Sequence, residues 1–240
     1  MDGAPFHLRD NRLLSLLDDA TLQTLAPHLE PVRLHQGDAM YEPLRPMLHA
    51  WFPTDCVLSM LAANADGEMA VEVATIGSEG MVGVALYLGA ELAHGLVFTQ
   101  VDGGAFRMPA DVFRAATRDR PALARVVLRY THALMVQIAQ GTACNRVHHI
   151  GQRCARWLLQ THDRVRGDTF DLTQEYLAHM LGERRAAVNA AASQLQSQGL
   201  IRYTRGRIQV TDRPGLEAAA CSCYGVIRDQ YVRMLAPVAP

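Results

Sequence analysis

The chain lacks several features that would assign it to a common class of protein. Within its 240 residues no apolar run reaches the roughly 18 residues that a membrane helix needs, so we expect no membrane span. Its first residues, MDGAPFHLRD, lack the basic and then apolar pattern of a signal peptide, which predicts a cytoplasmic protein. Lysine is absent, since all 23 basic residues are arginine.

Signatures of catalysis and of metal binding are also missing. The sequence contains no Gly-rich phosphate loop, no zinc-ligand spacing and no nucleophile elbow, so we expect no enzyme and no cofactor. Cys221 and Cys223 fall in a predicted helix over 216–235, which would point their thiols about 200° apart and so exclude a common metal ion. The five cysteines form no C-x-x-C pair, and reduced thiols are expected in a cytoplasmic protein. The sequence assigns no redox role to Cys144, Cys154, Cys221 or Cys223.

What the sequence does contain is a helix-turn-helix pattern over residues 172–210. Thr173 can cap a short apolar helix, and Gly182 permits a sharp turn before a second helix that starts near Arg184. Two short extended runs then flank Arg205-Gly206 and predict a hairpin. Together these elements predict a winged helix-turn-helix, whose second helix enters the DNA major groove.

The charge distribution supports DNA binding by this segment. Between Leu172 and Arg213 six arginines stand against three carboxylates, whereas the whole chain carries a net charge of −1. Positive charge is therefore concentrated where DNA phosphates would lie. The alternative is a small globular lobe with solvated arginines, but Arg184 and Arg185 open the second helix, which favours DNA binding.

The N-terminal part of the chain predicts two short helices over 11–29 and then an antiparallel jelly roll. Asn64–Gly67 supplies the glycine that a hairpin turn needs. So many short runs at close spacing are typical of a small barrel or roll. The predicted strands are Pro31–His35, His49–Phe52, Val57–Ala62, Met69–Thr75, Gly95–Val101 and Ala105–Met108.

A long helix is predicted to begin at Pro121. Large or apolar residues recur along it at alternating steps of four and three, the spacing of a coiled-coil seam, and this predicts a parallel dimer. Packing of the same residues against the roll is the alternative. A hinge is expected at 144–147, followed by an amphipathic helix over 149–165. The predicted seam consists of Leu123, Val127, Tyr130, Leu134 and Gln137.

This order of elements resembles the CRP/FNR family of bacterial transcription regulators over residues 12–213. The most specific stretches are HIGQRCARWLL, LTQEYLAHMLGERRAAVNAAASQLQSQGLI, LHQGDAMY and IGSEGMVG. The resemblance implies an α+β protein and a homodimer that binds a palindromic operator and contacts RNA polymerase. The implied parts are a cyclic-nucleotide-binding-like roll (12–118), a dimerisation helix (119–145), a winged helix-turn-helix (146–213) and a C-terminal helical extension (214–240).

The candidate ligand pocket departs from the family pattern. Members that bind cyclic AMP have a Gly-Glu pair and then an Arg, but here the pair reads Gly83-Val84 and no Arg occurs in Glu91–Phe98. A buried phosphate needs a charge-assisted partner, so we expect no response to cyclic AMP. The effector stays unidentified. Candidate pocket residues are Gly83, Val84, His94 and Ile138.

The resemblance also implies roles at the DNA. Arg185 matches a base-reading position and can contact guanine, and Asn189 can contact adenine. Predicted phosphate contacts are Thr173, Arg184, Arg205 and Arg207. The alternative function is a ligand-sensing signalling module that acts through protein or RNA polymerase contacts without specific DNA readout.

Overall fold

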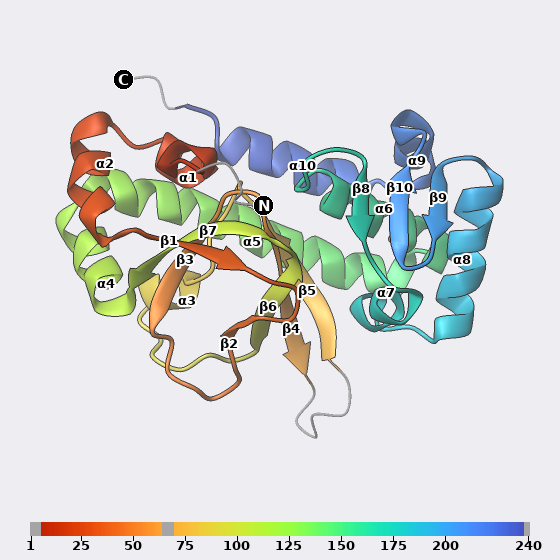
Figure 1. Cartoon of the computed structure of the whole chain (residues 1–240), viewed down its shortest axis with the longest axis horizontal. Coiled ribbons are helices and arrows are strands. Elements are labelled where there is room, and N and C mark those ends of the chain that lie inside the picture. Colours follow the sequence, from red (N-terminus) through yellow and green to blue (C-terminus); the bar gives the residue numbers. More distant parts are fainter. Residues whose placement is uncertain (1–5, 64–69, 238–240) are drawn as a thin grey trace.

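The computed structural model describes residues 6–63 and 70–237, so the predicted turn at Asn64–Gly67 lies outside the described residues. A β-roll occupies one end of the molecule and a small helical domain with its own sheet occupies the other (Figure 1). The long helix α5 (Pro121–Val147) runs past both (Figure 1). None of the described helices is long and apolar enough to cross a membrane.

The N-terminal strands form an antiparallel roll, which confirms the predicted architecture. One sheet has the order β1-β7-β3 and the facing sheet the order β2-β6-β4-β5. The strand β2 was not predicted, because its three residues are too few to show an alternating pattern. The strands are β1 (Glu30–Leu34), β2 (Ala39–Tyr41), β3 (His49–Pro53), β4 (Val57–Ala63), β5 (Ala70–Ile76), β6 (Leu96–Val101) and β7 (Gly103–Pro109).

Short helices close the ends of the roll. The Asn11 side chain accepts hydrogen bonds from the backbone N–H groups of Leu13 and Leu14 and so caps α1, while Asp18 caps α2. These helices confirm the pair predicted over 11–29. The helices of this half are η1 (Leu8–Asp10), α1 (Arg12–Ser15), α2 (Asp19–Leu25), η2 (Ala26–His28), α3 (Val84–Tyr87) and α4 (Ala110–Asp119).

The inner face of α5 belongs to the core of a single chain. It packs against the roll and against the C-terminal helix α10 (Cys223–Met234). The predicted dimer seam is therefore wrong, because side chains that are 0–5 % exposed in one chain cannot meet a second chain. These interior residues are Leu123, Val127, Tyr130, Leu134 and Gln137.

The predicted hinge also lies elsewhere. Because 144–147 contains no helix-breaking residue, α5 continues through it to Val147, and the next residue, His148, has an extended backbone (φ −106°, ψ 147°). The next helix, α6 (Ile150–His162), is shorter than the predicted 149–165.

The C-terminal residues form two helices in place of the continuous one predicted over 216–235. Helix α9 (Arg213–Ala219) ends at Ala220, which is extended, and α10 begins three residues later. Cys221 therefore precedes α10, and the prediction that the two thiols diverge on one helix fails. Leu216 packs into the C-terminal core while Ile227 packs on the roll, so the chain has to change direction between them.

A half-buried residue, Glu72 on β5, joins the roll to α6 through its carboxyl group. The Trp157 indole N–H donates to it at 2.6 Å, and the Ser59 and Thr75 hydroxyls lie at 2.6 and 2.8 Å. Burial raises the pKa of Glu72 above the ordinary carboxyl value despite these hydrogen bonds. The Ser59 hydroxyl also lies 2.8 Å from the Gln100 amide oxygen, so a protonated Glu72 lets Ser59 accept from one neighbour and donate to the other.

This arrangement predicts that Glu72→Gln changes how stability depends on pH. The native chain holds the Glu72 proton more tightly than the unfolded chain, so this group contributes stability that is lost as pH rises above the ordinary pKa of 4.5. Unfolding in urea between pH 5 and 8 should show E72Q gaining stability relative to the wild type as pH rises, by up to about 1.4 kcal/mol per pH unit. Glu91→Gln, at an exposed site, should show the same pH dependence of unfolding free energy as the wild type. If the curves of E72Q and the wild type were parallel, the raised pKa of Glu72 would be contradicted.

Candidate nucleic-acid interface and sensor cavity

The helix-turn-helix forms as predicted. The Thr173 hydroxyl accepts from the Tyr176 N–H at 3.1 Å and caps α7 (Gln174–Leu181). Gly182 then takes a left-handed conformation (φ 61°), which a residue with a Cβ rarely adopts. Arg184 is the N-cap of α8 (Arg185–Ser197), so both predicted arginines stand at the start of the second helix.

A buried arginine on α6 fixes the turn between the two helices. Arg153 donates to the Glu183 carboxylate and to the Leu181 carbonyl, each at 2.6 Å. Both acceptors flank the turn between α7 and α8, and charge-assisted hydrogen bonds from a buried guanidinium have a fixed geometry. Arg153 therefore restricts the angle between the two helices. This role of Arg153 was not predicted, because its partners lie 30 and 28 positions away in the chain.

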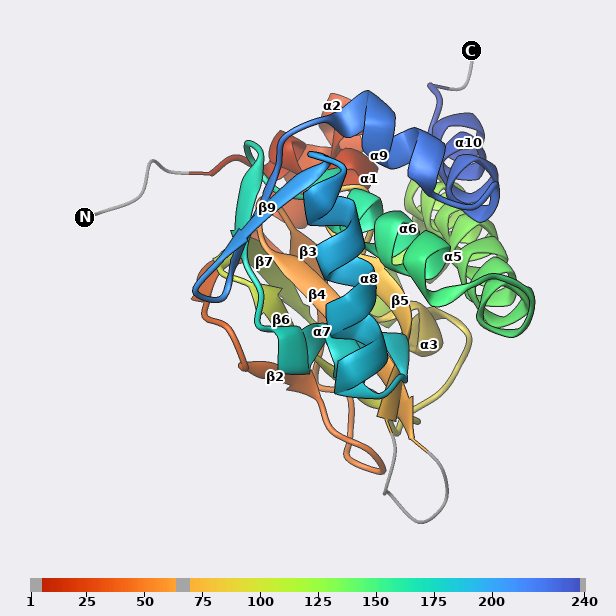
Figure 2. The same cartoon turned by 90° about the vertical axis from the view of Figure 1, so that its right-hand side faces the viewer.

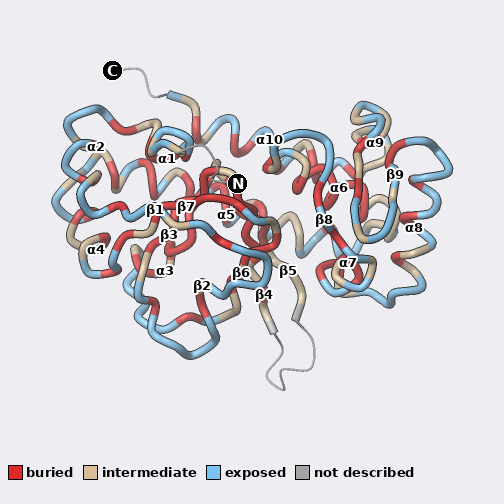
Figure 3. The backbone as a smooth tube through the Cα atoms, in the orientation of Figure 1, coloured by how far each residue is buried: buried red, intermediate tan, exposed pale blue. Residues whose placement is uncertain are grey.

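Helix α8 presents a smooth outer face. Figure 2 views it from the front of this domain, and Figure 3 shows its outward turns coloured as exposed. Val188 and Leu195 are buried, while the exposed centre consists of small side chains at steps of four and three: Ala186, Ala190, Ser193 and Ser197. Small side chains allow a groove floor to approach the helix closely, and alanine can contact the thymine methyl group. Ser193 was missed, although the helical spacing from Ala186 could have identified it.

The two predicted base-reading residues lie at one edge of this face. Arg185 is exposed, whereas Asn189 is half-buried. Its Oδ1 atom is buried without a hydrogen-bond partner among the described residues. Such an acceptor is costly unless water or another molecule satisfies it.

The predicted hairpin beside α8 is present. Arg205 and Gly206 both have positive φ, 50° and 80°, the combination of a tight two-residue hairpin turn. Arg207 pairs with Asp171 at 2.8 Å, but both side chains are more than 60 % exposed, so a phosphate can displace this weak pair. The strands are β8 (Thr169–Asp171), β9 (Ile201–Thr204) and β10 (Arg207–Val210), in the order β8-β10-β9. An open groove on this sheet is lined by Arg202, Arg205 and Arg207 together with Thr169, Asp171, Thr204 and Gln209.

The roll encloses an apolar cavity of about 160 Å³. Its lining includes Gly83, Val84 and His94, as predicted, with Leu134 of α5 closing one side. Gly83 has φ 128°, and a Cβ there would meet the Ala50 backbone at 3.2 Å, so this position requires glycine. No arginine or lysine contributes to the lining among the described residues.

Ile138 lies outside this cavity, which corrects its predicted place in the pocket. It lines a separate hollow between α5, β5 and α6, because it stands one turn beyond Leu134 and past the mouth of the roll. Arg107 is the arginine of the roll strand β7, and it does not line the cavity either. Its guanidinium forms a bidentate pair with Glu30 on the neighbouring strand β1.

Both the helix-turn-helix and the overall fold are similar to those of known proteins. Residues 152–219 match the family model described as the Crp-like helix-turn-helix domain. No curated protein matches the chain.

Solved structures share the fold over most of the chain. FixK2 from Bradyrhizobium japonicum superposes with a TM-score of 0.68 at 15 % identity, covering 80 % of this chain and 98 % of that one. A CRP-family transcriptional regulator from Thermus thermophilus gives 0.66 at 17 %, covering 79 % and 96 %. The regulator CLP from Xanthomonas campestris, named as c-di-GMP responsive, gives 0.64 at 15 %, covering 80 % and 99 %. The chain therefore carries a Crp-like helix-turn-helix domain within the fold of the CRP/FNR transcription regulators.

Proposed function

We propose that the protein is a homodimeric, sequence-specific DNA-binding transcription regulator. The observation that carries this proposal is the juxtaposition of α8 and the hairpin. Exposed arginines stand at the start of α8 and at the tip of the hairpin. The small-residue face of α8 is exposed to solvent. Such a surface combines phosphate contacts that position the protein with a helix that can enter the major groove.

Each exposed arginine has a role that its position supports. Arg184, Arg205 and Arg207 are proposed to contact phosphates, as is Thr173 at the N-terminus of α7, where backbone N–H groups favour an anion. Arg185 is proposed to read a base from the edge of the α8 face. Asn189 is proposed to read a base next to the one that Arg185 contacts. Hydrogen bonds to that base would give the Asn189 Oδ1 atom or its amide N–H group a partner. Contact with RNA polymerase remains a prediction of the family resemblance.

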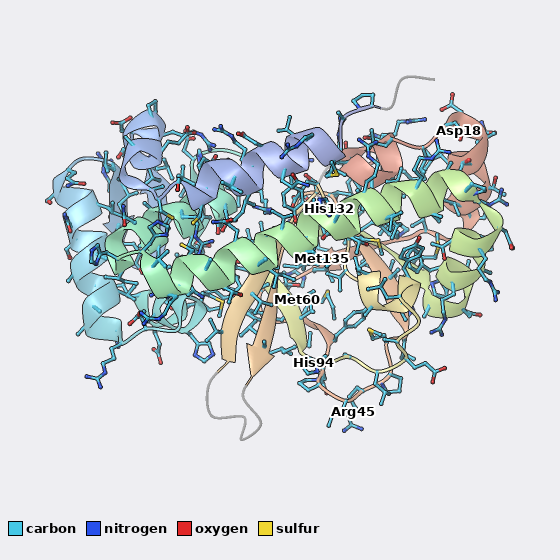
Figure 4. All side chains as sticks on the ribbon, turned by 180° about the vertical axis from the view of Figure 1, so that it is seen from behind. Asp18, Arg45, Met60, His94, His132 and Met135 are labelled. Carbon is cyan, nitrogen blue, oxygen red and sulfur yellow. The ribbon has the colours of Figure 1, made fainter. Side chains whose placement is uncertain are left out.

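The outer face of α5 is proposed as the dimer interface. Its exposed residues follow the same alternating steps as the buried ones: Arg125, Leu128, His132, Met135, Ala139 and Thr142. Leu128 is 56 % and Met135 62 % exposed, which is costly in water and favours a partner. Figure 4 shows α5 uncovered along this side, with His132 and Met135 labelled on it. A second copy fits because a heptad stripe is complementary to itself about a twofold axis.

The effector is proposed to be something other than cyclic AMP. Val84 replaces the carboxylate that would bind the ribose, and the cavity lining described above offers no arginine for the phosphate. The similar fold of CLP, named as c-di-GMP responsive, accommodates a different signal. The apolar lining, with His94 at its edge, favours a small and largely apolar ligand.

The two arginines at the start of α8 should act differently. Arg184→Ala should weaken all duplexes about equally and reduce the salt slope by about one. Arg185→Ala should cost about 1–3 kcal/mol at one base pair per half-site and relax the preference there. Arg118→Ala, an exposed arginine on α4 at the far end of the molecule, is the matched control and should bind like the wild type. Equal losses on specific and random duplexes for R185A would remove its base-reading role.

The outer stripe of α5 should hold the dimer together. Met135→Glu would place two carboxylates against each other in the interface and should give a folded monomer by analytical ultracentrifugation. Val232→Glu adds the same charge at a site on α10 that is 68 % exposed, and it should leave the dimer intact. A dimeric M135E protein would show that another surface joins the two chains.

Calorimetry with cyclic AMP and cyclic GMP should detect no binding at micromolar concentrations. A charge-assisted hydrogen bond contributes about 1.5–3 kcal/mol, and an unpaired buried phosphate costs more. Losing both the ribose and the phosphate partners should therefore weaken binding at least about a hundredfold. A micromolar dissociation constant for either nucleotide would contradict this account of the cavity.

A further inference from the structure

Four metal-binding side chains converge where α5 meets α10. Cys144 comes from the end of α5, and His148 is the residue that follows this helix. Cys221 lies in the turn before α10, and Cys223 is the first residue of α10. Their ligand atoms all lie within 4.8 Å of one another, although the residues are up to 79 positions apart in the chain. All three cysteines are buried, and His148 is half-buried.

The spacing of these atoms fits one tetrahedral ion. Cys144 Sγ lies 3.4 Å from Cys221 Sγ, and Cys223 Sγ lies 3.5 Å from His148 Nδ1. Zinc bonds of about 2.3 Å to sulfur and 2.0–2.1 Å to nitrogen give tetrahedral edges of roughly 3.5–3.8 Å. The other pairs of ligand atoms are at most 4.8 Å apart, and small side-chain rotations bring them to the tetrahedral edge length.

The surroundings suit a site with excess negative charge. Three thiolates and one divalent ion leave a net charge of −1, which needs nearby donors. The Gln140 side-chain amide donates to Cys223 Sγ at 3.1 Å, and Cys223 occupies the first turn of α10, where the helix dipole favours an anion.

The geometry points to a structural zinc site with the ligands Cys144, His148, Cys221 and Cys223. Four protein ligands with sulfur and imidazole donors are typical of structural zinc, and they leave no open position for catalysis. An iron–sulfur cluster fits less well, because it spreads its ligands over several iron atoms and so holds them farther apart than one ion does. A bound ion would pin α10 to α5 beside His148, the residue where the chain turns from α5 towards the helix-turn-helix.

The test measures metal in the full-length protein purified without a polyhistidine tag. Mass spectrometry of the metal content should find about one zinc per chain. Cys221→Ser and His148→Ala should each weaken zinc binding by at least about 100-fold. Cys154→Ser is the matched control, because Cys154 is a buried thiol on α6 outside the group, and it should keep its zinc.

A second measurement covers variants that fail to fold. Wild-type protein stripped of metal and titrated with Co²⁺ should develop the visible bands of tetrahedral cobalt with thiolate ligands, and added Zn²⁺ should abolish them. Protein that carries no zinc and gives no cobalt bands overturns the proposal. A Cys144–Cys221 disulfide in anaerobically purified protein, or iron with the absorption of a cluster, overturns it as well. None of these readouts depends on DNA binding.

Discussion

Burial of the inner face of α5 is the interaction on which the rest of the structure depends. The Tyr130 hydroxyl donates to the Met81 carbonyl at 3.0 Å, and Gln137 donates to the Thr75 carbonyl at 3.1 Å while accepting from Tyr231 at 2.7 Å. Roll, long helix and C-terminal helix are thereby joined in one core. Because that face is filled from within the chain, the opposite, exposed stripe is the part of α5 that remains for the proposed dimer.

Contacts between the roll and the C-terminal domain hold α8 and the hairpin in one orientation relative to the roll. Trp157 reaches Glu72, and the Tyr176 and Phe98 rings meet edge to face with centroids 5.9 Å apart. At the far end of α5 the cysteine–histidine group lies beside the turn at His148. A change in the roll or in α5 would therefore alter the orientation of α8 through either of two sets of contacts, those of Trp157 and Tyr176 with the roll or those of the cysteine–histidine group.

The sequence predicted the parts that local chemistry determines. Thr173, Gly182 and the Arg205-Gly206 turn act within a few residues of the backbone they shape, so their roles were readable. The proposed dimer stripe was not, because α5 repeats the 4–3 spacing on both faces and the spacing alone does not say which face the roll covers. The cysteine–histidine group was missed because it requires the bend at Ala220, where neither proline nor glycine marks the break. That bend follows from two separate cores, which is tertiary information.

The most direct test of sequence-specific DNA binding by a dimer is selection from a random duplex library with the full-length protein. A dimer that reads DNA with α8 should enrich an inverted repeat whose half-site centres are separated by about one helical turn, 10–10.5 base pairs, or a multiple of it. Twofold symmetry in the selected sequence would reflect two α8 helices related by the axis of the α5 pair. No enrichment over several rounds at low salt, or a selected site without twofold symmetry, would contradict the account.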